Sequence, residues 1–242
     1  MAAIKAEGLT KHYNGIVAVD ALDLQVEQGE LLSLLGVNGA GKSTTIKMLS
    51  GLTKPTGGQA YVAGHSIIQE EWSVKRRIGV SPQETAVAPN LSVKENLELM
   101  CGIHGLTKSQ SKEQIGHLAD QFDLHSILSK HAGKLSGGWQ RRVSIAMALV
   151  GQPEILFLDE PTLGLDVIAR SELWGVIGGM KGKVTIILTT HYMEEAQALS
   201  DRIGIMKNGK LLVTGTAREL MEIAGTDSFE QAFISIVKEA YV

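Results

Sequence analysis

The sequence predicts an α/β fold, and three observations support that expectation. Apolar runs of strand length recur along the chain, helix-length stretches follow them, and glycines cluster where the runs end. Near-continuous apolar runs are typical of a parallel sheet covered on both faces, and alternation of strand with helix indicates an α/β architecture. The expected strands are Leu31–Leu35, Ile155–Leu158, Val184–Leu188 and Ile203–Met206, and the expected helices are Lys42–Ser50, Asp166–Met180 and Met193–Leu199.

Two regions depart from this alternation. Residues 1–30 alternate apolar and polar side chains around turn residues, which predicts a small antiparallel sheet. Residues 85–150 have the pattern of a helical insertion into the α/β core. One of its helices opens with the capping box Ser92-Val-Lys-Glu95, a second is expected to open near Ser111–Gln114, and a third begins near Gly137.

The carboxyl-terminal part of the chain carries a strong turn signal. Asn208-Gly209 lies between the apolar runs Ile203–Met206 and Leu211–Val213, which predicts a two-residue β-hairpin. The sequence of residues 217–242 then predicts two short helices.

Composition narrows the class of protein. Of the 242 residues, 44% are hydrophobic and 20% charged, a balance that excludes an intrinsically disordered chain. Lys and Arg total 23 against 26 Asp and Glu, which argues against a nucleic-acid binder acting by bulk positive charge. The single cysteine, Cys101, excludes an internal disulfide framework. Because no signal-peptide core and no apolar run of about 18 residues occurs, we expect a soluble protein of the cytoplasm.

A phosphate-binding loop follows the first buried strand. The segment Gly36-Val-Asn-Gly-Ala-Gly41-Lys42-Ser43 fits the pattern GxxxxGK[ST], with a strand before it and a helix after it. Glycines let successive backbone N–H groups turn toward phosphate oxygens, and the helix N-terminus adds partial positive charge. Lys42 is expected to reach the β- and γ-phosphates, and the Ser43 hydroxyl to ligate Mg²⁺. A chance match in a glycine-rich chain is the alternative, and the flanking strand and helix disfavour it.

Two acids end the second buried strand. Asp159 and Glu160 come directly after Ile155–Leu158, where Asp159 is expected to hold the Mg²⁺ shell. Glu160 is placed to polarise a water molecule for in-line attack on the γ-phosphate. The alternative is that both acids merely cap or solvate a strand end, and the phosphate loop makes the metal interpretation the stronger one. No [NT]KxD motif occurs, which disfavours a guanine-nucleotide switch.

A third motif carries a family resemblance. The segment Leu135-Ser136-Gly137-Gly138-Trp139-Gln140 stands just upstream of the acidic strand, and Asp159 follows Arg142 by 159 − 142 = 17 positions. In this arrangement the chain resembles the ATP-binding cassette (ABC) ATPases, whose signature is LSGGQ. Further family motifs follow the same order along the chain: Tyr13 as the adenine-stacking aromatic, Gln83 of the Q-loop, Gly164–Asp166 as the D-loop and His191 as the switch histidine.

The resemblance covers about residues 4–220 and implies a P-loop NTPase (RecA-like) core. The implied ABC ATPase domain is 1–220, divided into an antiparallel β part at 1–30, the core at 31–84 and 151–215, and a helical subdomain at 85–150 that carries the signature. A short helical tail would occupy 216–242. The implied catalytic residues are Lys42, Glu160 and His191, and the implied metal ligands are Ser43, Gln83 and Asp159. The implied ATP contacts are Tyr13, Gly36, Asn38, Gly39, Ala40, Gly41, Lys42, Ser43, Thr44, Gln83, Ser136, Gly137, Gly138 and Asp166.

The resemblance also implies a head-to-tail dimer. Ser136, Gly137 and Gly138 lie at a predicted helix N-terminus, which offers N–H groups and a dipole to an anion, and each signature would bind the γ-phosphate held by the other subunit. The chain departs from the family at Trp139, where glutamine is usual. We hypothesise that Trp139 alters packing beside the ribose or the partner subunit.

Two functions remain open at this point. The chain is expected to be the ATP-hydrolysing motor of a membrane transporter, or a soluble ABC ATPase of DNA repair, chromosome or translation work. A single cassette without coiled-coil or zinc insertions favours the transporter, and Thr44–Gly57 and Leu158–Arg170 resemble the ABC-2 type exporter ATPases. The expected ligands are ATP and Mg²⁺. The expected partners are a separate integral-membrane permease, docking near 83–90 and the helical insertion, and a second copy or paralogous ATPase, with no nucleic acid. The chain would then lie in the cytoplasm, peripheral on the inner face of the membrane.

Overall fold

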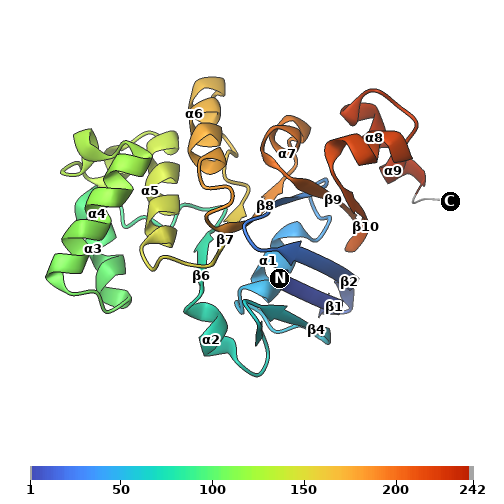
Figure 1. Ribbon diagram of the computed structural model, residues 1–242, viewed down its shortest axis with the longest axis horizontal. Coiled ribbons are helices and arrows are strands. Elements are labelled where there is room, and N and C mark those ends of the chain that lie inside the picture. Colours follow the sequence, from blue (N-terminus) through green and yellow to red (C-terminus); the bar gives the residue numbers. More distant parts are fainter. Residues whose placement is uncertain (1, 240–242) are drawn as a thin grey trace.

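The computed structural model describes residues 2–239 and contains two sheets. The larger one has six strands in the order β10-β9-β3-β8-β7-β6, and all neighbours in it are parallel except the β9–β10 pair. Helices follow its strands, so the α/β prediction is confirmed (Figure 1). Its strands are β3 (Leu31–Leu35), β6 (Ile78–Ser81), β7 (Ile155–Asp159), β8 (Thr185–Thr190), β9 (Arg202–Lys207) and β10 (Lys210–Gly215).

Alternate residues of the central strands face two different cores. Ile155 and Phe157 of β7 join a cluster with α1 (Lys42–Leu49) and the smaller sheet. Leu156 and Leu158 of the same strand join the cluster under the helices on the opposite face. Because successive side chains of a strand point to opposite faces, an all-apolar strand is what a sheet buried on both faces requires.

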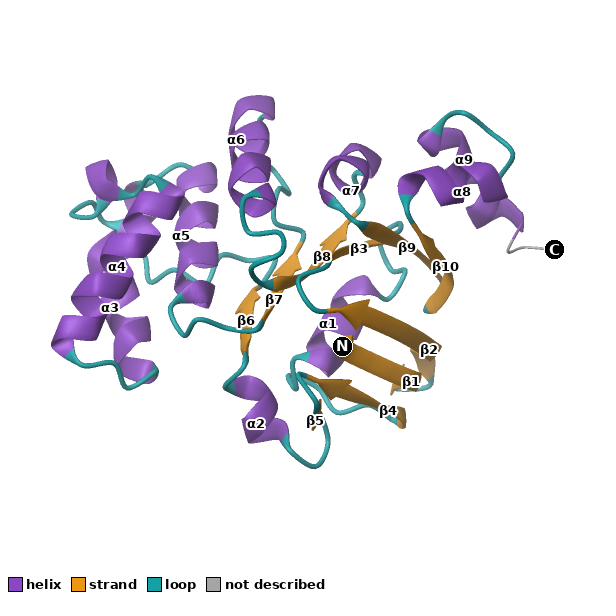
Figure 2. Ribbon diagram, viewed as in Figure 1, coloured by secondary structure: helices purple, strands orange, loops and turns teal. Residues whose placement is uncertain are grey.

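The smaller sheet is antiparallel, with the order β2-β1-β4-β5 (Figure 2). β1 (Ala2–Tyr13) and β2 (Ile16–Glu27) lie in the predicted range. The sheet extends beyond 1–30, however, because β4 (Gly57–Val62) and β5 (His65–Ser66) return from the loop after α1 to pair beside β1. The short helix α2 (Glu71–Lys75) then leads to β6.

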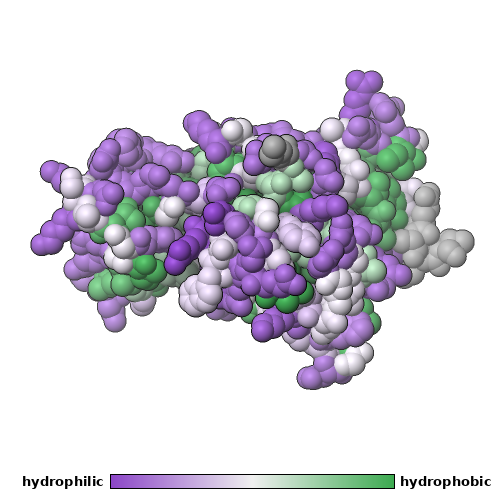
Figure 3. All heavy atoms as spheres, turned by 60° about the horizontal axis from the view of Figure 1, so that its bottom comes forward, coloured by the Kyte–Doolittle hydropathy of each residue, from purple (hydrophilic) through white to green (hydrophobic). Residues whose placement is uncertain are grey.

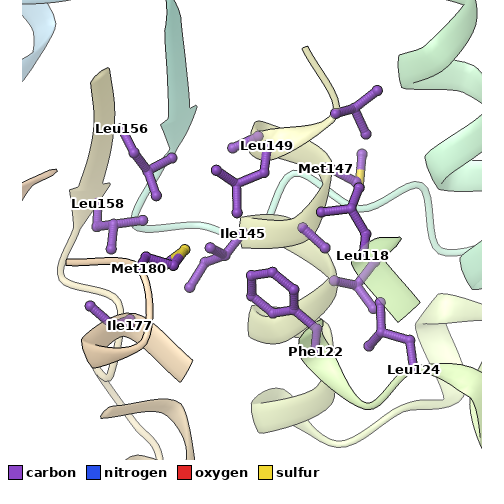
Figure 4. Packing of buried hydrophobic residues seen from close by; sticks show 14 of the residues in the cluster. Leu118, Phe122, Leu124, Ile145, Met147, Leu149, Leu156, Leu158, Ile177 and Met180 are labelled. Carbon is purple, nitrogen blue, oxygen red and sulfur yellow. The ribbon is translucent and has the colours of Figure 1, made fainter. Parts of the chain in front are cut away.

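The helical insertion lies at one end of the molecule, remote from the carboxyl-terminal helices (Figure 1). Its helices are α3 (Val93–Ile103), α4 (Lys108–Phe122) and α5 (Gly137–Leu149), joined by 3₁₀ turns at His125–Ile127 and Ala132–Lys134. Figure 4 shows Phe122 of α4 and Ile145 of α5 packed toward Leu158 of the sheet and Met180. The buried face of α5 therefore fixes the insertion against the core.

Two predicted helix starts, at Ser92 and at Gly137, are confirmed, and a third is wrong. Ser92 and Glu95 form the expected capping box at α3. The box of α4 is instead Thr107 with Gln110: the Gln110 side chain accepts from the Thr107 N–H at 2.9 Å. Ser111 is already inside the helix, where its hydroxyl donates back to the Thr107 carbonyl at 2.9 Å. A threonine in extended conformation is the better N-cap here because its own carbonyl starts the helix.

The remaining elements complete the carboxyl-terminal half. α6 (Val167–Gly178) and α7 (Met193–Leu199) follow β7 and β8. The β9–β10 hairpin turns at Asn208 and Gly209, both with positive φ (49° and 81°), as the two-residue turn requires. α8 (Ala217–Ile223) and α9 (Phe229–Glu239) form the predicted helical tail, whose residues 240–242 lie outside the described part. Across residues 2–239, no helix has the length and apolar character needed to cross a membrane.

Candidate active site

The loop between β3 and α1 is shaped by glycines whose backbones are crowded. A Cβ on Gly36 would lie 2.4 Å from the Met206 carbonyl oxygen, and one on Gly41 would lie 2.6 Å from that of Ala18. Gly41 is also the N-cap of α1, with φ of 102°, which side-chain-bearing residues avoid. The segment therefore needs glycine to curl around the N-terminus of α1.

A pocket of about 550 Å³ lies over this loop. Because it covers the N-terminus of α1, it presents N–H groups and a positive dipole end to whatever enters. It brings the loop together with Gln83, Glu160 and His191, which come from three other segments. The lining residues are Ile16, Val17, Ala18, Asn38, Gly39, Ala40, Gly41, Lys42, Ser43, Thr44, Gln83, Glu160, Leu163 and His191.

Lys42 is held inside this pocket by three oxygen atoms. Its Nζ donates to the carbonyls of Gly36 at 2.7 Å and Val37 at 3.3 Å, and lies 3.2 Å from Glu160 Oε1. Only 6% of each of the Lys42 and Glu160 side chains is exposed. The ammonium is therefore paired and buried directly beneath the space where phosphate oxygens would lie.

The two expected metal ligands Ser43 and Asp159 are hydrogen-bonded to each other. The Ser43 hydroxyl donates to Asp159 Oδ1 at 2.8 Å, and the Thr189 hydroxyl donates to the same oxygen at 2.5 Å. Hydroxyl and carboxylate oxygens are the ligands that Mg²⁺ prefers, with waters and substrate phosphates completing its shell. Gln83 is exposed and lines the same pocket. The donor set fits a magnesium ion.

The Glu160 carboxylate lies between the Lys42 ammonium and the His191 ring. His191 donates from Nδ1 to Glu160 Oε2 at 2.8 Å, opposite the Lys42 contact on Oε1. The backbone N–H of Glu160 donates to the Thr189 hydroxyl at 3.0 Å. Glu160 has φ of 49°, a left-handed conformation that costs a residue with a side chain free energy and recurs at functional sites.

The signature residues lie outside this pocket. Ser136 is the N-cap of α5, and its hydroxyl makes no capping hydrogen bond within the described residues. Asp166 of the D-loop caps α6, accepting from the Ala169 N–H at 2.9 Å. A Cβ on Gly138 would come within 3.1 Å of the Ala169 Cβ. The structure thus brings the signature beside the D-loop, and Tyr13 also lies outside the residues that line the pocket.

Trp139 packs inward rather than standing free. It is partly buried against the cluster under α5, and the Arg142 guanidinium lies 4.8 Å from its ring centre. Arg142 also bonds to Glu172 of α6 at 2.5 Å. The tryptophan therefore contributes to the contact between the signature helix and α6.

Several site residues escaped sequence reasoning. Ile16 and Val17 present apolar side chains to the pocket, and these side chains are 72% and 45% exposed. The only sequence signal for this exposure is that two adjacent apolar residues begin a strand. Thr189 joins Asp159 to Glu160 from a neighbouring strand. Arg141 of α5 donates to the carbonyls of Pro82 at 2.7 Å and Gln83 at 2.5 Å, and burial lowers its pKa. These contacts depend on topology, which no local motif encodes.

Fold and site together define a P-loop nucleotide-binding protein with a carboxylate aimed at the phosphate pocket. The family described as "ABC transporter" matches residues 19–163, and the chain therefore belongs to that family, whose ATP-binding domains hydrolyse ATP.

Two relatives and one solved structure illustrate the kinship. The chain is 42% identical over 226 residues to the daunorubicin/doxorubicin resistance ATP-binding protein DrrA of Streptomyces peucetius, covering 93% of this chain and 68% of that protein. It is 39% identical over 242 residues to the probable multidrug ABC transporter ATP-binding protein YbhF of Escherichia coli K12, covering 98% of this chain and only 42% of that protein. The fold matches the dimeric post-hydrolysis ATP-binding cassette MJ0796 bound to ADP and Pi with a TM-score of 0.79 and 26% identity, covering 88% and 98% of the two chains.

These comparisons confirm the resemblance to exporter-type ABC ATPases. They also support the ATP-binding subunit of a transporter over a soluble ABC ATPase of DNA repair, chromosome or translation work.

Proposed function

We propose that this chain is the ATP-hydrolysing motor of an ABC-2 type exporter, working as a head-to-tail dimer beneath a separate membrane permease. The observation that carries the proposal is the Lys42–Glu160–His191 arrangement over the phosphate loop, with contacts of 3.2 Å and 2.8 Å on the two carboxylate oxygens. The relatives named for drug resistance and multidrug transport support export as the direction.

Residues in and beside the pocket have distinct proposed roles in hydrolysis. The N–H groups of the loop and Lys42 bind and orient the phosphates. Ser43, Asp159 and Gln83 would hold Mg²⁺, which would neutralise phosphate charge when bound. Glu160 accepts the proton of the attacking water, and His191 fixes the direction of its carboxylate. The exposed apolar side chains of Ile16 and Val17, beside Tyr13, form a surface on which an adenine ring can lie.

The signature supplies the second half of the site in a dimer. Because Ser136 lies at the N-terminus of α5 with its hydroxyl uncommitted to capping among the described residues, the helix end is available to a phosphate from outside the chain. Ser136, Gly137, Gly138 and Asp166 would complete the pocket of the facing subunit. The dimeric state of the matched cassette structure supports this arrangement.

The proposed catalytic roles of Glu160 and Lys42 are tested by the variants Glu160→Gln and Lys42→Ala. Glu160→Gln is expected to keep ATP binding and lose turnover by about 10²- to 10⁴-fold, the range for a missing general base. Lys42→Ala is expected to lose nucleotide binding or turnover. Glu194→Gln, which changes an exposed acid near His191, is the matched control. Wild-type turnover in Glu160→Gln would remove that residue from the mechanism.

The proposed association with a membrane permease is tested by isolating the tagged chain in detergent from its native cells. Figure 3 shows a mostly hydrophilic face, with hydrophobic residues at the end formed by the helical insertion, at the opposite end and toward the bottom. The helical insertion is the region proposed to dock the permease. Recovery of an integral-membrane protein with the chain is the expected result, and daunorubicin-like drugs are the first transport substrates to assay. Recovery of ribosomes, DNA or soluble proteins instead would overturn the transporter assignment.

A further inference from the structure

Glu195 is a buried acid to which the proposed mechanism assigns no role. It lies in the first turns of α7, four positions after His191, and its exposed fraction is 0%. The indole Nε1–H of Trp174 in α6 donates to its Oε1 at 3.0 Å. A carboxyl group is placed in an interior only at a cost unless its oxygen atoms are all paired. The contacts of its other oxygen are therefore the informative ones.

Two threonines of the active-site segments lie close to the Glu195 carboxyl. Among the described residues, Oε2 is buried without a hydrogen-bond partner of regular geometry, and so is the hydroxyl of Thr162. The Thr162 and Thr190 hydroxyls nevertheless lie close enough to favour the ionised carboxyl. Thr162 stands two positions after Glu160, and Thr190 stands directly before His191. Glu195 is thus in contact with the segments that carry the proposed base and the switch histidine.

Complete burial without a paired cation favours the neutral form of Glu195. Burial raises the pKa of the Glu195 carboxyl, and the negative charge of Glu160 raises it further, although the Thr190, Thr162 and Trp174 hydrogen bonds act in the opposite direction. In its neutral form the acid can accept from Trp174 on one oxygen and donate from the other to the Thr162 hydroxyl.

Within residues 2–239, no cation forms an ion pair with this acid. On α6, the Arg170 guanidinium lies 4.8 Å from the ring centre of Tyr192, and its Nε is buried without a hydrogen-bond partner among the described residues. His191 is committed to Glu160. The acids Glu194 of α7 and Glu230 of α9 are exposed and line a neighbouring pocket with Arg170. Glu160 is the charge that acts on Glu195 from the sheet.

We propose that Glu195 is a positioning residue for ATP hydrolysis, whose neutral side chain joins α6, the segment after Glu160 and the segment before His191 into one unit. It holds His191 on the Glu160 carboxylate, and its neutrality keeps a second negative charge away from that base. The inference rests on the proposed roles of Glu160 and His191. Through Trp174, Glu195 links the helix that follows the D-loop to the segments that carry Glu160 and His191.

The test compares Glu195→Gln with Glu195→Ala. Glutamine reproduces the neutral acid, because its carbonyl accepts from Trp174 and its amide donates to Thr162. We expect Glu195→Ala to lower kcat about tenfold or more with little change in the KM for ATP, since a slightly misplaced base loses rate of this order. Glu195→Gln is expected to restore kcat to near the wild-type value at pH 7. Failure of glutamine to rescue, or wild-type kcat in Glu195→Ala, would overturn the proposal.

Two further readouts separate positioning from simple structural support. The wild-type kcat is expected to fall on the alkaline side as Glu195 ionises beside Glu160, and Glu195→Gln is expected to lack that fall. In a His191→Ala background, Glu195→Ala is expected to add little further loss of kcat, because it acts through His191. Identical pH profiles for wild type and Glu195→Gln, or fully additive losses, would contradict the inference.

A nucleotide-free measurement gives an independent check. A carboxyl whose folded pKa is raised lets the unfolded chain lose its proton first, so stability falls as pH rises above the ordinary value of 4.5 toward the folded pKa. The melting temperature of Glu195→Gln relative to wild type is therefore expected to increase with pH over that interval. A constant difference would refute the neutral acid. If Glu160→Gln stalls hydrolysis and the Glu195 results fail, only this inference falls; if Glu160→Gln turns over normally, the proposed function falls first.

Discussion

The Lys42–Glu160 pair should be measurable as a coupling energy in the nucleotide-free protein. The two charges lie 3.2 Å apart with 6% of each side chain exposed. At an effective dielectric constant of about 20, their gross attraction is about 5 kcal/mol. The cost of removing both ions from water offsets most of this attraction. A net coupling of about 1–3 kcal/mol is the range found for contacting residues.

Lys42→Met and Glu160→Gln, singly and together, form the cycle that measures this coupling. Lys42→Met leaves the Glu160 carboxylate buried without its ammonium, which is expected to cost about 3–5 kcal/mol. Glu160→Gln costs less, because the Lys42 ammonium keeps the carbonyls of Gly36 and Val37. The double variant removes both charges, so it should be more stable than the sum of the single losses predicts by the coupling energy.

Urea unfolding without nucleotide, followed by circular dichroism, measures the four free energies of unfolding. The slopes with urea must agree among the variants for midpoints to report stability alone. Additive losses, within about 0.3–0.5 kcal/mol, would show that the pair makes no net contribution and would refute the reasoning.

Two further substitutions test the packing and the corrected helix start. Gly79→Ala places a Cβ 2.2 Å from the Ala148 carbonyl oxygen and is expected to lower the free energy of unfolding by at least about 2 kcal/mol. Gly116→Ala, in the open face of α4, should instead raise the free energy of unfolding by about 0.5–1 kcal/mol. Equal melting temperatures for the two variants would contradict the packing. Thr107→Ala should cost about 1 kcal/mol by removing the N-cap of α4, while Ser111→Ala should cost a few tenths; the reverse order in chemical denaturation would favour the start first predicted from the sequence.

The buried strands could be predicted because a strand covered on both faces carries mostly apolar side chains. β3, β7 and β8 are buried along their whole length, and each contains an apolar run that its few polar residues, such as Ser33 and Thr189, do not obscure. β6 escaped prediction because its four residues, Ile78–Ser81, include a glycine and a serine. The glycine is required by the close approach of Ala148, a contact made by a distant part of the chain. β4 escaped for the same kind of reason, since it starts with two glycines.

The residues of the candidate site also divide into those that a local sequence motif predicts and those that depend on contacts between distant segments. The phosphate loop could be predicted because its chemistry resides in eight consecutive residues. The pairing of Asp159 with Thr189 could not, because it depends on β7 and β8 lying side by side. Two adjacent acids at the start of a helix, Glu194 and Glu195, are typical of a solvated first turn, yet the Glu195 side chain is fully buried. An acid at the start of a helix looks the same in sequence whether its side chain faces solvent or Trp174.

Contacts within one chain tie together the elements proposed to act on two different nucleotides. Arg141, in the helix that begins at the signature, holds the carbonyls of Pro82 and Gln83 beside the phosphate pocket. The same helix packs on α6 through Gly138 and Ala169, immediately after the D-loop. A displacement of α5 on meeting a second subunit must therefore move Gln83 or break two hydrogen bonds from a buried guanidinium, which is costly. In a head-to-tail dimer, occupation of one site would in this way be transmitted to the other through α5.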